Sequence, residues 1–174
     1  MQLQGEGIQA EVELLLAGVG NTLAGDDGAG VVLLEELRRR LGSRPGLDYA
    51  ELAGDLYAIW DLLARTRAIL FLDAVCGSPP GRLVIGKTAP RAFSASFHQS
   101  DVSTVMRSLA TLREKGLPAW TIWGITIDPP QNLGEGLSSP VLRAVEESAE
   151  RLFQQISQGT LEIAGYRIPA LTEV

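Results

Sequence analysis

Two stretches of the chain are nearly continuous runs of apolar residues, the pattern of strands buried on both faces. They cover residues 13–19 and 68–72, and residues 120–127 alternate loosely as a further main strand. Weaker segments at 47–52 and 82–86 complete the set of predicted strands. Because amphipathic segments separate these strands, we expect a three-layer α/β/α sandwich around a mostly parallel, twisted sheet of roughly five strands.

Apolar residues spaced by three or four positions predict four helices, beginning near residues 29, 56, 102 and 139. Asp55 precedes the second of these helices and is expected to cap it. The expected core-facing residues are Val32, Leu33, Leu37 and Leu41 in the first helix, Leu56, Ile59, Trp60 and Leu63 in the second, Val102, Val105, Met106, Leu109 and Leu112 in the third, and Val141, Leu142, Val145, Ala149 and Leu152 in the last.

The length of 174 residues fits one domain, predicted to span residues 1–174. Its core is expected at 13–155, with an extension on either side. Residues 1–12 are polar and are expected to be loosely held, and the tail from Gly159 is expected to add a short strand or a hairpin.

Composition and charge narrow the class of protein. The hydrophobic content of 45% and charged content of 21% are typical of a soluble globular protein. A net charge of −6 without a basic cluster disfavours nucleic acid as a partner. No apolar stretch approaches the ~20 residues of a membrane span, the N-terminus does not resemble a signal peptide, and one cysteine excludes an internal disulfide. We therefore expect a cytoplasmic protein.

The first strand ends in a glycine-rich turn that carries two adjacent acids, Asp26 and Asp27. Gly18 and Gly20 allow the backbone to turn tightly, and Asn21 tolerates unusual backbone dihedrals. An acid just before a helix is usually its N-terminal cap. With two adjacent acids, one can cap the following helix while the other points into a crevice.

Asp73 closes the strand at 68–72, and in α/β sheets the ligand crevice lies outside the carboxyl ends of the strands. Asp27 and Asp73 are therefore expected on the same rim. His98, the only histidine, precedes a predicted helix whose positive end favours a neutral imidazole. Two carboxylates and one imidazole suit a divalent transition metal with open coordination positions. A turn residue at Asp73 and a solvated histidine are the simpler alternatives.

The sequence offers two weaker candidates, a dinucleotide-binding site and a thiol-based catalytic site. Gly18-Val19-Gly20 begins like a dinucleotide-binding fingerprint, but Leu23 stands where the third glycine belongs, and the two acids would repel a pyrophosphate. Cys76 follows a strand end and with His98 offers a thiolate–imidazole pair. A small cysteine beside a buried strand is more often a packing residue, so the thiol is the weaker candidate.

Several motifs together resemble those of the hydrogenase maturation proteases, the endopeptidases that trim the C-terminal extension from the large subunit of nickel–iron hydrogenases. Their order and spacing agree over roughly residues 13–155. The matching residues are Gly18-Val19-Gly20-Asn21, Leu23, Asp26-Asp27-Gly28 and Gly30 in the first element, Asp73-Ala74-Val75 in the second, Ser96 and His98 in the third, and Gly124-Ile125, Gly134, Leu137-Ser138 and Val141 in the last.

The resemblance implies a phosphorylase/hydrolase-like fold and a peptidase that acts on the large-subunit precursor after nickel insertion. It places both the catalytic and the metal-contacting roles on Asp27, Asp73 and His98. Nickel is expected to arrive on the bound substrate, although another divalent metal can occupy the site in vitro. The chain is expected to act as a monomer.

Supporting roles are implied for Gly20, Asn21 and Asp26, with Asp27 as the working carboxylate. The chain departs from the family pattern in residues 51–56, where only Gly54 and Leu56 fit the family's turn, so Gly54 is the one candidate for a substrate contact. Some family members carry glutamate at the position of Asp27, so a metal here would sit closer to the backbone. A noncatalytic nickel-binding assembly chaperone using the same three ligands is the alternative function.

Overall fold

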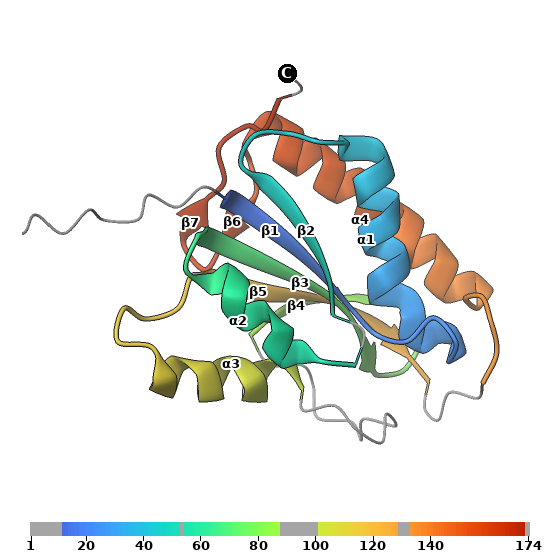
Figure 1. Ribbon diagram of the computed structural model, residues 1–174. Helices are drawn as coiled ribbons and strands as arrows, with labels where there is room; N and C mark the ends of the chain where they lie inside the picture. The colour runs from blue at the N-terminus through green and yellow to red at the C-terminus, as the bar shows by residue number, and fades with distance from the viewer. Residues whose placement is uncertain (1–11, 53, 88–100, 129–132, 173–174) are drawn as a thin grey trace, which may run out of the picture.

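The computed structural model describes residues 12–52, 54–87, 101–128 and 133–172 (Figure 1). The described elements are, in chain order, β1 (Val12–Val19), the 3-10 helix η1 (Gly25–Gly28), α1 (Ala29–Leu41), β2 (Leu47–Leu52), the 3-10 helix η2 (Leu56–Ile59), α2 (Trp60–Leu63), β3 (Thr66–Cys76), β4 (Leu83–Gly86), α3 (Val102–Leu112), β5 (Ala119–Ile127), α4 (Ser139–Gln158), β6 (Glu162–Ile163) and β7 (Tyr166–Arg167).

Five strands form the central sheet in the order β2-β1-β3-β5-β4. The first four are parallel, and β4 runs antiparallel to β5 at one edge. The carboxyl ends of β1, β2, β3 and β5 therefore lie at one edge of the sheet. This arrangement confirms the predicted α/β sandwich with a mostly parallel sheet.

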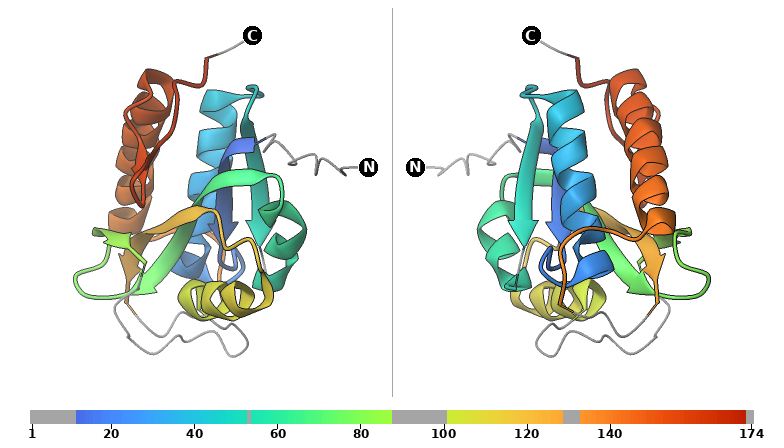
Figure 2. Two further views of the ribbon diagram at one scale, coloured as in Figure 1. Left: turned by 90° about the vertical axis from the view of Figure 1, so that its left-hand side faces the viewer. Right: turned by 90° about the vertical axis from the view of Figure 1, so that its right-hand side faces the viewer.

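Helices cover both faces of the sheet, as Figure 2 shows. Alternate residues of each strand face opposite layers. Leu70 and Leu72 of β3 belong to the core shared with α1 and α4, whereas Ile69 and Phe71 belong to the core shared with η2, α2 and α3. The two faces of β3 therefore present different surroundings to any side chain at its carboxyl end.

β3 is longer than the sequence predicted. We expected the strand to end at Asp73, but it continues to Cys76 because β5 pairs with it as far as Ile127. On its other side, pairing with β1 stops at Gly18 and Leu72. Asp73 thus lies inside a strand, one residue beyond the last residue that β1 covers.

Three residues that we expected on the core-facing sides of helices are exposed: Trp60 (41%), Leu112 (68%) and Leu142 (42%). Trp60 begins α2, Leu112 ends α3, and Leu142 lies in the first turn of α4. Helix ends extend past the sheet that the middle turns cover, so apolar spacing predicts burial poorly there. The other predicted core positions of these helices are buried or partly buried.

The C-terminal tail forms the predicted hairpin, with β6 and β7 antiparallel. Leu161, Ile163 and Ile168 are buried in the core beneath α1 and α4. The buried guanidinium of Arg44 bonds to the carbonyl oxygens of Leu41 and Leu171 and so holds the tail in place. Among the described residues, no helix combines the length and the apolar character needed to cross a membrane.

Candidate active site

The turn after β1 can form only with glycine at two positions. Gly20 has a φ of +133°, and a Cβ there would lie 2.0 Å from the carbonyl oxygen of Asp27. A Cβ on Gly28 would lie 2.8 Å from the Cα of Thr22. The turn therefore folds back on itself and brings the Asp27 carboxylate to the Asn21 backbone N–H, which donates to Oδ2 at 3.1 Å.

A third glycine seats this turn on the sheet. A Cβ on Gly30 would lie 2.2 Å from the carbonyl oxygen of Leu72 and 2.3 Å from that of Val19. The first turn of α1 therefore packs directly against the last residue of β1 and against Leu72 in β3. This contact carries Asp27, three residues earlier, to the rim that holds Asp73.

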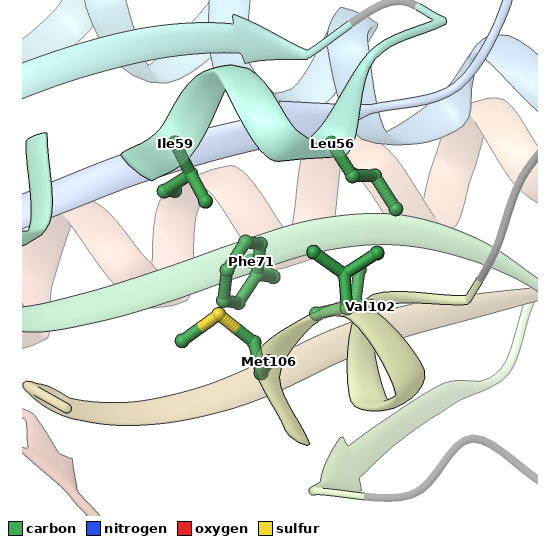
Figure 3. A pocket seen from close by; sticks show the side chains of 6 residues that line it. Leu56, Ile59, Phe71, Val102 and Met106 are labelled. Atoms are coloured by element: carbon green, nitrogen blue, oxygen red, sulfur yellow. The ribbon is translucent and has the colours of Figure 1, made fainter. Parts of the chain in front are cut away.

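Asp73 projects from the sheet face that α3 covers, because it alternates in phase with Phe71. Gly124 is its register partner on β5, so no side chain stands beside the carboxylate on that strand. One step down the same face, Phe71 borders a shallow apolar hollow (Figure 3), whose other lining residues are Leu56, Ile59, Val102, Val105 and Met106. Asp73 thus lies between an apolar layer and the rim.

The surroundings of Asp73 favour its neutral form. Desolvation by burial is the largest cause, and the charges of Asp27 and Asp101 add to it, against a hydrogen bond from the Ala74 backbone, so that its pKa rises to about 7. Burial likewise raises the pKa of Asp27 from its ordinary value, opposed by the hydrogen bond from Asn21. The charge of Asp27 thus contributes to the raised pKa of Asp73, and both acids lie at the end of the sheet on which the first turn of α1 packs.

Asp26 and Asp27 point to different partners, and neither caps α1. The residue at the N-cap of α1 is Gly28, which has no side chain to donate or accept a bond. Asp26 is buried, with 8% of its surface exposed, and its Oδ1 accepts the backbone N–H of Ser138 at 2.6 Å. The expectation that one acid caps this helix is therefore wrong, because the turn directs one carboxylate to the loop before α4 and the other to Asn21.

Asp101 is a third carboxylate near the site, and our sequence reasoning missed it. It caps α3, accepting the Thr104 backbone N–H at 3.0 Å and the Thr104 hydroxyl at 2.9 Å. Desolvation raises its pKa, but the hydrogen bonds from Thr104 and Ser103 lower it below its ordinary value. An acid directly before an amphipathic helix was a detectable signal.

The remaining predicted residues are placed as follows. His98 and Ser96 lie outside the described residues. Among those that are described, no three His, Cys, Asp or Glu side chains are grouped to hold a metal ion. Gly54 has a φ of +89° in the connection between β2 and η2, which explains a glycine there by backbone conformation alone. Asp55 caps η2 as expected, accepting the Tyr57 N–H at 2.9 Å.

Cys76 and Asp73 lie on opposite faces of the sheet. They are three residues apart in a strand whose pairing with β5 is uninterrupted, so their side chains alternate. Cys76 is partly buried. The thiol therefore does not share the face on which Asp73 meets α3.

One exposed leucine lies in the turn after β1, and another lies in the loop before α4. Gly25 donates to the carbonyl of Gly134 at 2.8 Å, and Gly134 donates to the carbonyl of Leu23 at 3.0 Å, which forms a short parallel bridge. Residues at the same register of a parallel bridge point to the same side. Leu23 (59% exposed) and Leu133 (88% exposed) hold such positions, so they present an apolar edge beside the turn.

No protein-family model matches the chain. Solved structures are similar to the chain over most of its length. The [NiFe] hydrogenase maturation protease HycI from Thermococcus kodakarensis is similar over 88% of this chain and 97% of its own, with a TM-score of 0.66 and 18% identity. The hydrogenase maturating endopeptidase HybD from E. coli is similar over 91% of this chain and 98% of its own, with a TM-score of 0.66 and 20% identity.

Among curated proteins, Protein FrxA of Pyrococcus furiosus is 29% identical over 141 residues, which cover 78% of this chain and 98% of that protein. The chain has the fold of the hydrogenase maturation proteases. The fold implied by the resemblance drawn from the sequence motifs is thus confirmed by these solved structures.

Proposed function

We propose that this chain is a cytoplasmic endopeptidase that removes the C-terminal extension of a nickel–iron hydrogenase large-subunit precursor after nickel insertion. One observation carries the proposal: Asp27 and Asp73 belong to two different segments at the carboxyl ends of the strands, burial raises the pKa of both, and the charge of Asp27 helps to raise that of Asp73 to about 7. Carboxyl groups with such raised pKa values are typical of catalytic sites. The fold shared with HycI and HybD supports the same class of activity.

Peptide hydrolysis requires a group that takes a proton from water and returns it to the leaving amine. A carboxyl with a pKa near neutrality performs both transfers best, and Asp73 has that property when it is not bound to the metal. Asp27, which accepts the Asn21 N–H and whose charge acts on Asp73, supplies a second carboxylate for orienting water or metal. The exposed Leu23 and Leu133 offer apolar contacts for a polypeptide next to these acids.

The proposed nickel is part of the substrate, held by thiolates of the precursor. The donor set on this chain fits that role. Two carboxylates provide oxygen ligands for a divalent metal but leave its shell incomplete, so further ligands must come from the precursor and from His98. His98 is assigned to this role by its sequence motif alone. A monomer with weak metal affinity of its own would therefore recognise a nickel-loaded precursor.

The test mixes the purified chain with a nickel-loaded and a nickel-free precursor and follows the precursor's C-terminus by mass spectrometry. We expect shortening of the loaded form only. Equal cleavage of both forms would contradict nickel recognition while leaving the peptidase standing. Binding without shortening would replace the peptidase with a nickel-binding assembly chaperone.

A Cys76→Ala variant tests the thiol mechanism in the same assay. We expect full cleavage activity, because Cys76 and Asp73 occupy opposite faces of β3. Loss of cleavage with an unchanged circular dichroism spectrum would assign the chemistry to the thiol.

A further inference from the structure

We infer that Asp26 is a positioning residue that fixes the carboxylate of Asp27 by fastening the acidic turn to the loop before α4. This inference rests on the proposed function for its catalytic consequence, although the contact itself does not. The acidic turn is defined here as residues 20–28, and the fastened loop as residues 133–138.

The central contact is a part-buried, charge-assisted hydrogen bond between the buried Asp26 and the exposed Ser138. Asp26 Oδ1 accepts the backbone N–H of Ser138 at 2.6 Å, across 112 residues of sequence. Ser138 is the N-cap residue of α4, and its own side chain makes no capping bond. The Asp26 carboxylate therefore also brings negative charge to the positive end of a 20-residue helix.

A second set of bonds joins the same two segments. Gly25 N–H donates to the Gly134 carbonyl, and Gly134 N–H donates to the Leu23 carbonyl. The acidic turn is thus attached to the fastened loop at two places, one on each side of Ala24. The bond from Asp26 to Ser138 adds a third hydrogen bond beyond this bridge, so the orientation of the turn relative to the fastened loop is constrained at a further point.

The constraint reaches Asp27 through the shortest possible route. Asp26 and Asp27 are consecutive residues of η1, and the Asp27 carboxylate is held at its other side by the Asn21 N–H. With Asp26 attached to Ser138, the backbone between these anchors is fixed at both ends. Asp27 is therefore held at one orientation relative to Asp73, while the Asp26 carboxylate bonds to Ser138.

The experiment compares Asp26→Ala, Asp26→Asn and a control, Ile168→Ala, in the full chain. Ile168 is buried in the C-terminal hairpin region and its loss lowers stability without touching the acidic turn. Amide hydrogen exchange is measured by NMR at Ser138 and Asn21. In Asp26→Ala both amides should exchange at least about tenfold faster than global destabilisation of the control accounts for. Asp26→Asn keeps an acceptor oxygen and should restore part of the protection.

Steady-state cleavage of the nickel-loaded precursor supplies the second measurement. Misplacement of one reacting group lowers the turnover rate more than substrate affinity, so kcat should fall about 10- to 100-fold in Asp26→Ala with KM little changed. Asp26→Asn should lie between Asp26→Ala and the wild type, and it decides the matter if Asp26→Ala does not fold.

Unchanged Asn21 protection, together with a kcat no lower than that of Ile168→Ala, would overturn the positioning role. If the wild-type chain does not cleave the precursor, the proposed function fails. The exchange measurement still decides in that case whether Asp26 holds the turn.

Discussion

At the amino end of the sheet, acidic side chains pair with arginines, whereas at the carboxyl end the charges of Asp27 and Asp101 help to raise the pKa of Asp73. Glu13, near the start of β1, pairs with Arg67 at 3.0 Å and accepts the Tyr166 hydroxyl at 2.5 Å. Asp48, near the start of β2, pairs with Arg65 at 2.8 Å. These contacts satisfy each carboxylate in the way expected of a structural surface.

The carboxyl end of the same strands is arranged differently. Across the described part of the chain, no lysine or arginine forms an ion pair with Asp27 or Asp73. Asp101 adds a third negative charge near Asp73. Acids with raised pKa values and no cationic partner are typical of functional sites, so this contrast is the reason for proposing the site at the carboxyl end.

The largest expected effect comes from Asp73→Asn and Asp27→Asn. Each should reduce cleavage of the nickel-loaded precursor by about 100- to 10,000-fold, the range typical for loss of a proton-transferring group. Mass spectrometry of the precursor measures the loss, and circular dichroism checks the fold. Glu13→Gln at the opposite end is the control and should retain full activity. Normal cleavage by either Asn variant would remove that residue from the catalytic set.

Next in size is Gly30→Ala, which tests how the turn sits on the sheet. A methyl group would lie 2.2 Å from the Leu72 carbonyl oxygen, so we expect a loss of about 3 kcal/mol or failure to fold. Gly42→Ala, at the other end of α1, meets no atom within 4 Å but has a φ of +61°, and should cost about 1 kcal/mol. Urea denaturation compares the two, and equal losses would contradict the close approach at Gly30.

The pH dependence of stability shows whether the native state favours the neutral or the charged form of Asp73. With a native pKa of about 7, Asp73 keeps its proton between about pH 4 and pH 7 while the unfolded chain releases it. Native Asp73 therefore binds more protons than the unfolded state, and stability falls as the pH rises through this window. Asp73→Asn should be more stable than the wild type by about 2–4 kcal/mol at pH 8 and nearly equal to it at pH 4.

Urea denaturation of both proteins at the two pH values tests this prediction. A wild type that gains stability between pH 4 and pH 8 relative to Asp73→Asn would show that Asp73 is stabilised in its charged form. That result would break the contrast between the two ends of the sheet.

The smallest expected effect is at the amino end itself. Glu13→Gln should lower stability by about 0.5–1 kcal/mol at pH 7, because its partner Arg67 is half-exposed and screened by solvent. Thermal unfolding at low and at high salt measures the change, which should shrink as salt rises. A loss that does not depend on salt would assign the effect to the hydrogen bond with Tyr166.

The layered α/β architecture and the sheet edge that carries Asp27 and Asp73 could both be predicted from the sequence. Apolar runs predicted β1 and the middle of β3, and apolar residues at helical spacing predicted α1. These patterns are reliable because each reflects burial against an entire layer of the fold. Gly20 indicated a tight turn, and the turn's glycine requirement followed from local backbone geometry. Asp27 and Asp73 could be assigned to one rim because parallel strands bring their carboxyl ends together wherever they occur in the chain.

Tertiary structure decided what depends on neighbours distant in sequence. Asp26 and Asp27 have different roles because Asp26 accepts a hydrogen bond from Ser138. Ser138 lies 112 residues further along the chain, so local spacing cannot identify it as the partner. The length of β3 beyond Asp73 depends on how far β5 accompanies it. The raised pKa of Asp73 depends on burial and on Asp101, which only packing of α3 brings near. Local patterns encode which layer a residue faces, but long-range packing selects its partner.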